Sequence, residues 1–176
     1  MSGKVFAIFL LVSCLLAGGW LYYLQVYGFY RDVPSFAGQD VQLMSRLSNE
    51  PKPIDYTEFK AIDADSSPIR YRACFKTQSK PSQLAQTFVT LTKATPRNAP
   101  DWFDCFNAAA LGKELESGTA TAFLSAKNIA FGVDRITAIS EDGHGFVWHE
   151  LNDCGTKSYD GTVTGEECPA RPEAGS

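Results

Sequence analysis

The sequence predicts an α+β protein: one N-terminal transmembrane helix, followed by an antiparallel-sheet domain with about two helices and disulfide bonds. Three observations predict this class. No charged residue stands between Lys4 and Arg31, four cysteines follow that apolar run, and the remaining chain contains about two helix-like segments between strand-like ones. Strands, then helices, then strands again are the order typical of an α+β domain, in which helices cover one face of an antiparallel sheet.

Length and composition allow one membrane segment and one domain of ordinary size. The chain has 176 residues, 44% of them hydrophobic and 20% charged, and a net charge of −4. Nucleic-acid binding is not expected, because it would require a basic stripe. We predict a transmembrane anchor over 1–30, a linker over 31–40, an α+β domain over 41–168 and a disordered tail over 169–176.

The apolar run is long enough to cross a bilayer. Residues 5–30 would form a helix about 39 Å long, against a hydrocarbon core of about 30 Å. Its aromatic residues gather at the C-terminal end, which is typical of a membrane–water interface: Trp20, Tyr22, Tyr23, Tyr27, Phe29 and Tyr30. The cationic N-terminus and Lys4 favour the cytoplasmic side, so the domain is expected outside the cytoplasm.

The residues Leu11-Val12-Ser13-Cys14 offer an alternative, because they match a bacterial lipobox. In that case the chain would be cut before Cys14, which would then carry lipid. However, the chain remains apolar well beyond Cys14, and the apolar core of a signal peptide has only about 7–15 residues. We therefore favour a retained anchor, with lipidation of Cys14 left open.

One face of this helix is predicted to dock against another membrane protein. Small residues four apart allow close approach of a second helix, and aromatic residues three or four apart share one face. The predicted docking residues are Ser13, Cys14, Ala17, Gly18, Gly19, Trp20, Tyr23 and Tyr27. Interfacial anchoring by the aromatic rings, with no docking partner, is the alternative.

The four remaining cysteines predict two disulfide bonds. Cys74, Cys105, Cys154 and Cys168 form an even set in a domain expected outside the cytoplasm. Of the three possible pairings we favour Cys74–Cys105 and Cys154–Cys168, because the second bond would close a tail with little apolar content. A CxxC redox motif is absent, and the spacings do not suit a zinc site.

The domain's elements follow from residue patterns. Strands are expected over 41–47, 56–62 and 69–75, with a polar turn over 63–68. Pro81 begins a helix to about Lys93, and Asp101 caps a helix from Trp102 to Leu115 that turns Phe103, Phe106, Ala110 and Leu111 inward and ends at Gly118. Strands over 119–126, 130–140 and 145–151 follow, with a hairpin turn over 141–145.

No residue pattern indicates catalysis, a metal or a cofactor. His144 and His149 are the only histidines; they should point in different directions and occupy surface positions. No GxSxG motif or glycine-rich phosphate loop is present, and the acidic pairs fall in expected turns. The run Asp101-Trp102-Phe103-Asp104-Cys105-Phe106 indicates a disulfide among aromatic side chains, or else a binding cleft.

Four blocks of sequence resemble an uncharacterised family of small, singly anchored proteins of alphaproteobacteria, of the Rhodobacter and Paracoccus type. The blocks are Tyr22–Tyr27, Ser66–Phe75, Ala99–Phe106 and Gly132–Arg135. The resemblance implies a single-pass protein of the bacterial inner membrane with a periplasmic domain, and it implies no assigned activity. Because such bacteria have elaborate respiratory and photosynthetic membranes, it suggests an accessory subunit there.

We therefore expect a non-enzymatic accessory or assembly subunit of an inner-membrane protein complex, with a respiratory complex as the first candidate partner. Its helix would dock in the lipid bilayer and its domain would cap the periplasmic face. The alternative is a tethered periplasmic ligand-binding or sensor module, which requires a pocket near Trp102 and Trp148.

Overall fold

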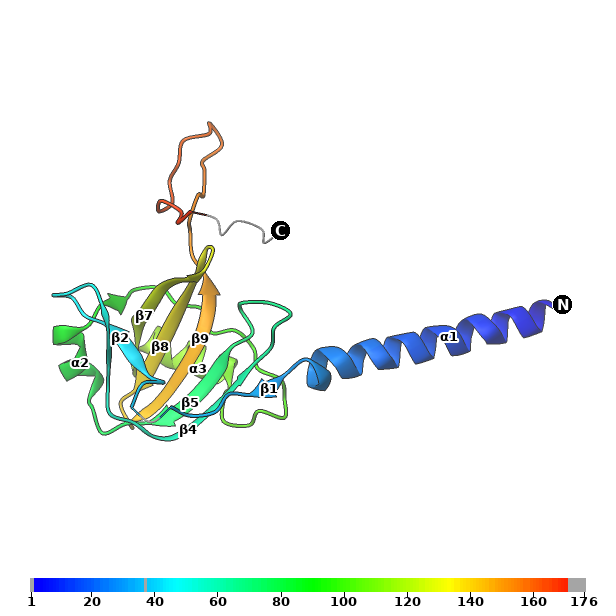
Figure 1. Cartoon of the computed structure of the whole chain (residues 1–176), viewed down its shortest axis with the longest axis horizontal. Helices are drawn as coiled ribbons and strands as arrows, with labels where there is room; N and C mark the ends of the chain where they lie inside the picture. Colours follow the sequence, from blue (N-terminus) through cyan, green and yellow to red (C-terminus); the bar gives the residue numbers. More distant parts are fainter. Residues whose placement is uncertain (1, 37, 171–176) are drawn as a thin grey trace.

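The N-terminal helix extends away from the domain in the computed structural model, which describes residues 2–36 and 38–170 (Figure 1). Helix α1, Gly3–Tyr23, continues into a π-helical turn η1, Leu24–Gly28. Within Gly3–Gly28, an 18-residue stretch has a mean hydropathy of 2.2 and is not buried by the domain, so the segment is long and apolar enough to cross a membrane. The predicted N-terminal apolar helix is thus present.

The domain is built on a seven-stranded antiparallel sheet. Its strand order is β1-β4-β5-β9-β8-β7-β6, and a separate ribbon pairs β2 with β3. The bounds are β1 Arg31–Asp32, β2 Gln42–Met44, β3 Pro51–Pro53, β4 Thr57–Asp63, β5 Arg72–Lys76, β6 Thr90–Leu91, β7 Ala120–Ala130, β8 Val133–Ser140 and β9 His144–Leu151. The predicted antiparallel sheet is confirmed; β1, β3 and β6 were not predicted, because two or three residues show no periodicity.

The sheet buries apolar side chains on both faces, because successive residues of a strand point to opposite sides. Ala73 and Phe75 belong to one core, which α2, Pro81–Thr87, covers together with the β2–β3 ribbon. Cys74 belongs to the other core, which α3, Ala108–Ser117, covers together with segment 99–106. The expectation that both helices lie on one face is therefore wrong: each apolar face requires its own cover.

Both helices are shorter than predicted. The first ends at Thr87, since Phe88 is extended and the chain then enters β6. The second begins at Ala108, with the Asn107 side chain accepting a hydrogen bond from the Ala110 backbone N–H at 3.0 Å. Segment 101–106 forms turns instead of the predicted first helical turns. Leu111 is buried as expected, whereas Ala110 is exposed.

Three glycines shape the ends of predicted elements. Gly118 ends α3 in the left-handed conformation with φ of 78°, as expected for a helix C-terminus. Gly145 begins the close packing of β9 on β5, where a Cβ atom would lie 2.1 Å from the Phe75 ring. The predicted hairpin between β8 and β9 is present around Gly143, which has φ of 89°.

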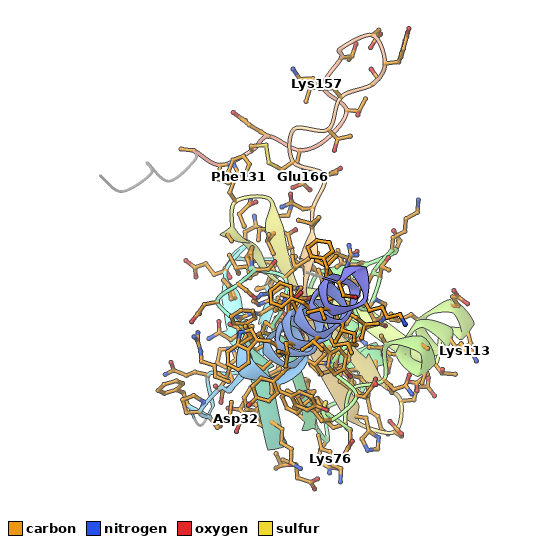
Figure 2. All side chains as sticks on the ribbon, turned by 90° about the vertical axis from the view of Figure 1, so that its right-hand side faces the viewer. Asp32, Lys76, Lys113, Phe131, Lys157 and Glu166 are labelled. Carbon is orange, nitrogen blue, oxygen red and sulfur yellow. A yellow bond between two sulfur atoms is a disulfide. The ribbon has the colours of Figure 1, made fainter. Side chains whose placement is uncertain are left out.

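The two disulfide bonds join Cys74 to Cys105 and Cys154 to Cys168, the pairing that the sequence favoured. The second bond closes a segment that projects beyond the sheet (Figure 1). Viewed along the helix, Lys157 and Glu166 lie in this segment (Figure 2), and Glu166 forms an ion pair with Lys127 of β7. The tail predicted over 169–176 lies, from residue 171 onward, outside the described residues.

Candidate functional site

The C-terminal end of the helix contacts the domain through Trp102. The indole Nε1–H of Trp102 donates a hydrogen bond to the Val26 carbonyl at 2.7 Å. The indole ring stacks on Tyr27, with ring centroids 6.3 Å apart, and meets the edge of Tyr30 at 5.8 Å. Because Tyr23 stacks on Tyr27 at 5.9 Å, the aromatic row of the helix continues into the domain.

Arg70 makes a second contact at the same helix end. Its guanidinium donates a hydrogen bond to the Gln25 carbonyl at 3.2 Å and lies over the Tyr30 ring at 5.5 Å. The last carbonyls of a helix lack partners within the helix, and a cation there also meets the negative end of the helix dipole. Arg70 and Trp102 thus satisfy two neighbouring carbonyls at the point where the helix ends.

The chain passes from the helix directly into the sheet. Residues Arg31 and Asp32 pair with Asp63 and Ile62 of β4, and the Val33 N–H donates to the Ala61 carbonyl at 2.9 Å. The range predicted as a linker, 31–40, therefore begins with an ordered edge strand. Helix and domain are joined by backbone pairing as well as by side chains.

The loop that presents Trp102 is itself fixed to the sheet. Arg72 of β5 is buried and donates to the carbonyls of Arg97 at 2.8 Å and Asn98 at 3.0 Å. Burial lowers the pKa of Arg72 to about 10, which leaves it protonated at neutral pH. The disulfide from Cys74 to Cys105 adds a covalent link from the same strand.

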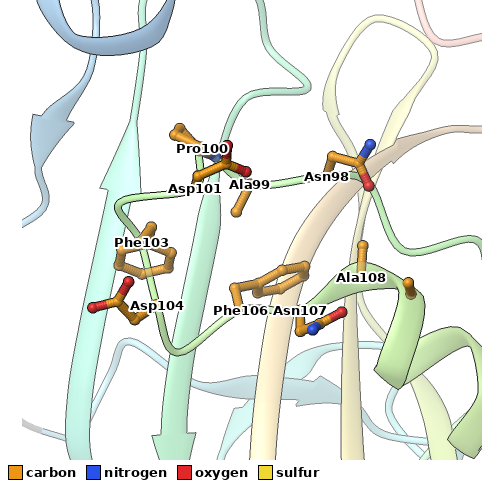
Figure 3. A pocket seen from close by; sticks show the side chains of 10 residues that line it. Asn98, Ala99, Pro100, Asp101, Phe103, Asp104, Phe106, Asn107 and Ala108 are labelled. Carbon is orange, nitrogen blue, oxygen red and sulfur yellow. The ribbon is translucent and has the colours of Figure 1, made fainter.

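Two cavities border the part of this loop from Asp101 to Asp104. The larger, of about 500 Å³, lies beside Asn98, Asp101 and Phe106 (Figure 3). The other, of about 370 Å³, lies between Lys60 and Trp102. Trp148 borders neither of them: its side chain is completely buried, and its Nε1–H donates to Glu150 at 3.1 Å. Of the two tryptophans expected near a pocket, only Trp102 lines one of these cavities.

Most of the predicted docking residues lie along the free part of the helix. Added Cβ atoms at Gly18 and Gly19 would meet no atom within 4 Å, and Cys14 is an exposed free thiol. The Ser13 hydroxyl donates to the Leu10 carbonyl at 2.9 Å, so it is satisfied within its own helix. Ala17, Trp20 and Tyr23 are exposed as well, whereas Tyr27 contacts Trp102.

The prediction of surface positions for both histidines holds only for His144, which is exposed and bonded to Asp142 at 2.8 Å. His149 is only 5% exposed, because residues 63–68 lie against its end of the sheet. The carbonyl of Pro68 is 2.7 Å from His149 Nδ1, within hydrogen-bond distance. Within the described part of the chain, no group of three His, Cys, Asp or Glu side chains could hold a metal ion.

A family model described as a family of unknown function (DUF6446) matches residues 41–169. The chain belongs to this family. The match covers the domain from β2 to the end of the projecting segment, so the predicted membership of an uncharacterised family is confirmed. The comparison with curated proteins found no match. The comparison with solved structures also found none.

The contacts that join this DUF6446 domain to its helix were not predicted from sequence. Trp102 and Val26 are 76 positions apart, and Arg70 and Gln25 are 45 apart. The block resemblance included Trp102 and Arg70, yet no local pattern connects either residue with the helix. Arg72 gave no signal either, because a buried arginine in a strand looks like any exposed one.

Proposed function

We propose that the protein is a non-enzymatic accessory or assembly subunit of a bacterial inner-membrane complex, with a respiratory complex as the first candidate. In this proposal the N-terminus is cytoplasmic, the helix docks in the bilayer and the domain caps the periplasmic face of the partner. The lone cation Lys4 before the apolar segment supports this orientation. Two disulfides support an oxidising compartment for the domain.

The observation that carries the proposal is the coupling of helix and domain through Trp102. A tether for an independent module needs only length, and a flexible linker would serve. Here the Val26 carbonyl, the Tyr27 ring and strand β1 all hold the domain at the helix end. A partner that binds the helix would therefore also determine where the domain sits, which is what a capping subunit requires.

The small residues on the helix support a protein partner within the bilayer. Lipid tails cover an apolar helix of any shape, whereas small residues at four-residue spacing let a second helix approach closely. At Gly18 the protein itself places nothing within 4 Å of an added Cβ atom. A larger side chain at this position would therefore interfere only with a neighbouring molecule.

The open space beside Gly18 defines the test of the proposal. Native membranes carrying Gly18→Leu are solubilised gently and compared on blue-native gels with membranes carrying Val12→Leu, which enlarges the helix surface about 120° around the axis from Gly18. We expect the wild type and Val12→Leu to migrate with a large complex. Gly18→Leu should migrate mostly as the free subunit. A wild-type chain that migrates only as a free monomer contradicts the proposal, and equal behaviour of both variants contradicts the docking face.

A second candidate is a tethered periplasmic ligand-binding or sensor module. The cavity of about 370 Å³ beside Trp102 and Lys60 favours it, because this cavity is within the size range of small-molecule sites. This function predicts that a small ligand raises the thermal unfolding midpoint of the purified full-length chain. It further predicts that Trp102→Ala abolishes this rise in the unfolding midpoint. An unchanged rise in that variant would show that the ligand does not bind in this cavity.

A further inference from the structure

Three side chains form a stacked group on neighbouring strands of the sheet. Arg135 of β8 is directly opposite His149 of β9, and its Nε–H donates to His149 Nε2 at 3.0 Å. Tyr71, which precedes β5, stacks on the His149 ring with centroids 4.7 Å apart. The Arg135 guanidinium also lies 4.7 Å from the centre of the Tyr71 ring.

The charge of this group resides on Arg135. The other ring nitrogen of His149, Nδ1, is 2.7 Å from the Pro68 carbonyl, which can only accept, so Nδ1 carries the proton. Nε2 then accepts from Arg135 and has no proton of its own. Burial lowers the pKa of His149 to about 4, so the ring is neutral at pH 7. The guanidinium is thereby held by one hydrogen bond and one aromatic face.

The two terminal amino groups of Arg135 form no hydrogen bond among the described residues, although the guanidinium and the Asp40 carboxylate attract each other. Among residues 2–36 and 38–170, no carboxylate forms an ion pair with Arg135, and no group accepts from its two terminal amino groups. Arg135 lines a cavity of about 370 Å³ between residues 63–68 and the end of β7. A fixed guanidinium with unpaired donors matches a carboxylate, which it binds through two parallel hydrogen bonds.

The same cavity also contains negative charge. Asp63 and Asp65 line it; Asp65 pairs with Arg31, whose charge also attracts Asp63. Within the described ranges, the Asp63 carboxylate accepts one hydrogen bond, from the Ala64 N–H at 2.8 Å. These carboxylates disfavour phosphate and other dianions, which would experience repulsion. They favour a ligand that presents an ammonium group beside its carboxylate.

Apolar side chains complete the lining. Ala64, Pro68, Ile129 and Ala130 face the cavity together with the charged groups. An aliphatic side chain of the ligand would find contact there. The volume is ample for one small molecule, and the lining is mostly polar, which suits a charged ligand.

We propose that this cavity binds a small zwitterion with the chemistry of a free aliphatic amino acid. Arg135 binds its carboxylate, Asp63 binds its ammonium group, and the apolar lining contacts its side chain. The site adjoins β1, because Arg31 pairs with Asp63 and Asp65, but it uses neither Trp102 nor a membrane partner. Its failure would therefore leave the accessory-subunit proposal untouched.

The test uses the purified full-length chain in detergent, with L-leucine as the probe. Binding is measured by calorimetry and by the side-chain Nε–H NMR signal of Arg135. The matched controls are 4-methylpentanoate, which is leucine without its ammonium group, and 3-methylbutylamine, which is leucine without its carboxylate. We expect leucine to bind at least tenfold more tightly than either control and to shift the Arg135 signal. No binding of leucine, or equally tight binding of a control, overturns the proposal.

Variants locate the site. Arg135→Gln should abolish leucine binding, and Asp63→Asn should weaken it at least tenfold while leaving the weak binding of 4-methylpentanoate unchanged. Asp63→Asn keeps an oxygen for the Ala64 N–H, so it preserves the local fold. Lys113→Gln, which removes one positive charge from the exposed surface of α3, should bind as the wild type does. Wild-type binding by both Arg135→Gln and Asp63→Asn would contradict the assignment.

Discussion

At the scale of single residues, His149 illustrates how a buried ring depends on its protonation state. Its Nδ1–H donates to the Pro68 carbonyl, and its Nε2 accepts from the Arg135 Nε–H. If Nε2 gained a proton, its N–H would face the Arg135 Nε–H, so two donors would oppose each other. The ring would also become a cation beside the Arg135 cation. Burial, with a smaller contribution from the positive charge of Arg135, lowers the pKa of His149 to about 4 from an ordinary value of 6.5.

This shift predicts that acid destabilises the domain. Between pH 6.5 and 4 the unfolded chain binds a proton at His149 that the folded chain does not. Stability is therefore complete above about pH 6.5 and falls as the pH decreases, by about 3 kcal/mol in total. Denaturant unfolding of the full-length chain at pH 7.5, 6 and 4.5 measures this loss.

His149→Phe serves as the control for this prediction, since it retains an aromatic ring against Tyr71 but does not titrate. The variant should be less stable at pH 7.5, yet its stability should change little down to pH 4.5. Aspartates have an ordinary pKa of 3.8, and hydrogen bonds from Tyr56 and Phe36 lower the pKa of Asp40 further. Protonation of such carboxylates therefore destabilises the domain only at lower pH. An equal slope in wild type and variant would show that His149 is not the cause.

At the scale of elements, the start of α3 separates two candidate N-caps. Asn107 accepts a hydrogen bond from the Ala110 N–H at 3.0 Å, whereas Asp101, the cap predicted from sequence, lies in an exposed turn. Asn107→Ala should therefore reduce the free energy of unfolding by about 1 kcal/mol, while Asp101→Ala should leave it nearly unchanged. Chemical denaturation of both variants decides between them, and the reverse order would place the helix start at Asp101.

The elements that sequence predicted well are the long strands. Strands β7, β8 and β9 each have eight or more residues and contain β-branched or aromatic residues, and the Gly143 turn between β8 and β9 has its own signal. The start of α3 was misplaced because Phe103 and Phe106 are spaced like residues on one face of a helix. Their turns are instead held by the disulfide at Cys105 and by the Arg72 guanidinium, which lies over the Phe106 ring at 5.8 Å. No local pattern reveals either contact.

The helix junction and the zwitterion cavity were beyond prediction for a related reason. Both arise where residues far apart in sequence meet: Trp102 with Val26, and His149 with Pro68 at a separation of 81. A single sequence records which residues are apolar or charged, but it does not record which loop folds over which strand. Burial of His149 and the partners of Arg135 depend on that arrangement alone.

At the scale of the whole molecule, the proposed capping function depends on the coupling of helix and domain. The helix end is bound by Trp102 and Arg70, and the chain then enters the sheet as β1. A tethered sensor would tolerate loss of this coupling, because its ligand site lies within the domain. An accessory subunit would not, since its domain must reach a fixed place on the partner.

Insertion of four Gly and Ser residues between Phe29 and Tyr30 separates these two functions. The helix retains its docking residues and the domain retains its fold, but a flexible linker of this kind no longer transmits orientation. With a photo-crosslinking residue at exposed Lys60, near Trp102, the wild-type domain should crosslink to one partner protein, and the insertion should reduce this yield at least fivefold. The same insertion after Leu47, which is 92% exposed in the β2–β3 loop, should leave the yield unchanged. Undiminished crosslinking after the Phe29 insertion would show that the partner binds the domain directly and that the junction does not position it.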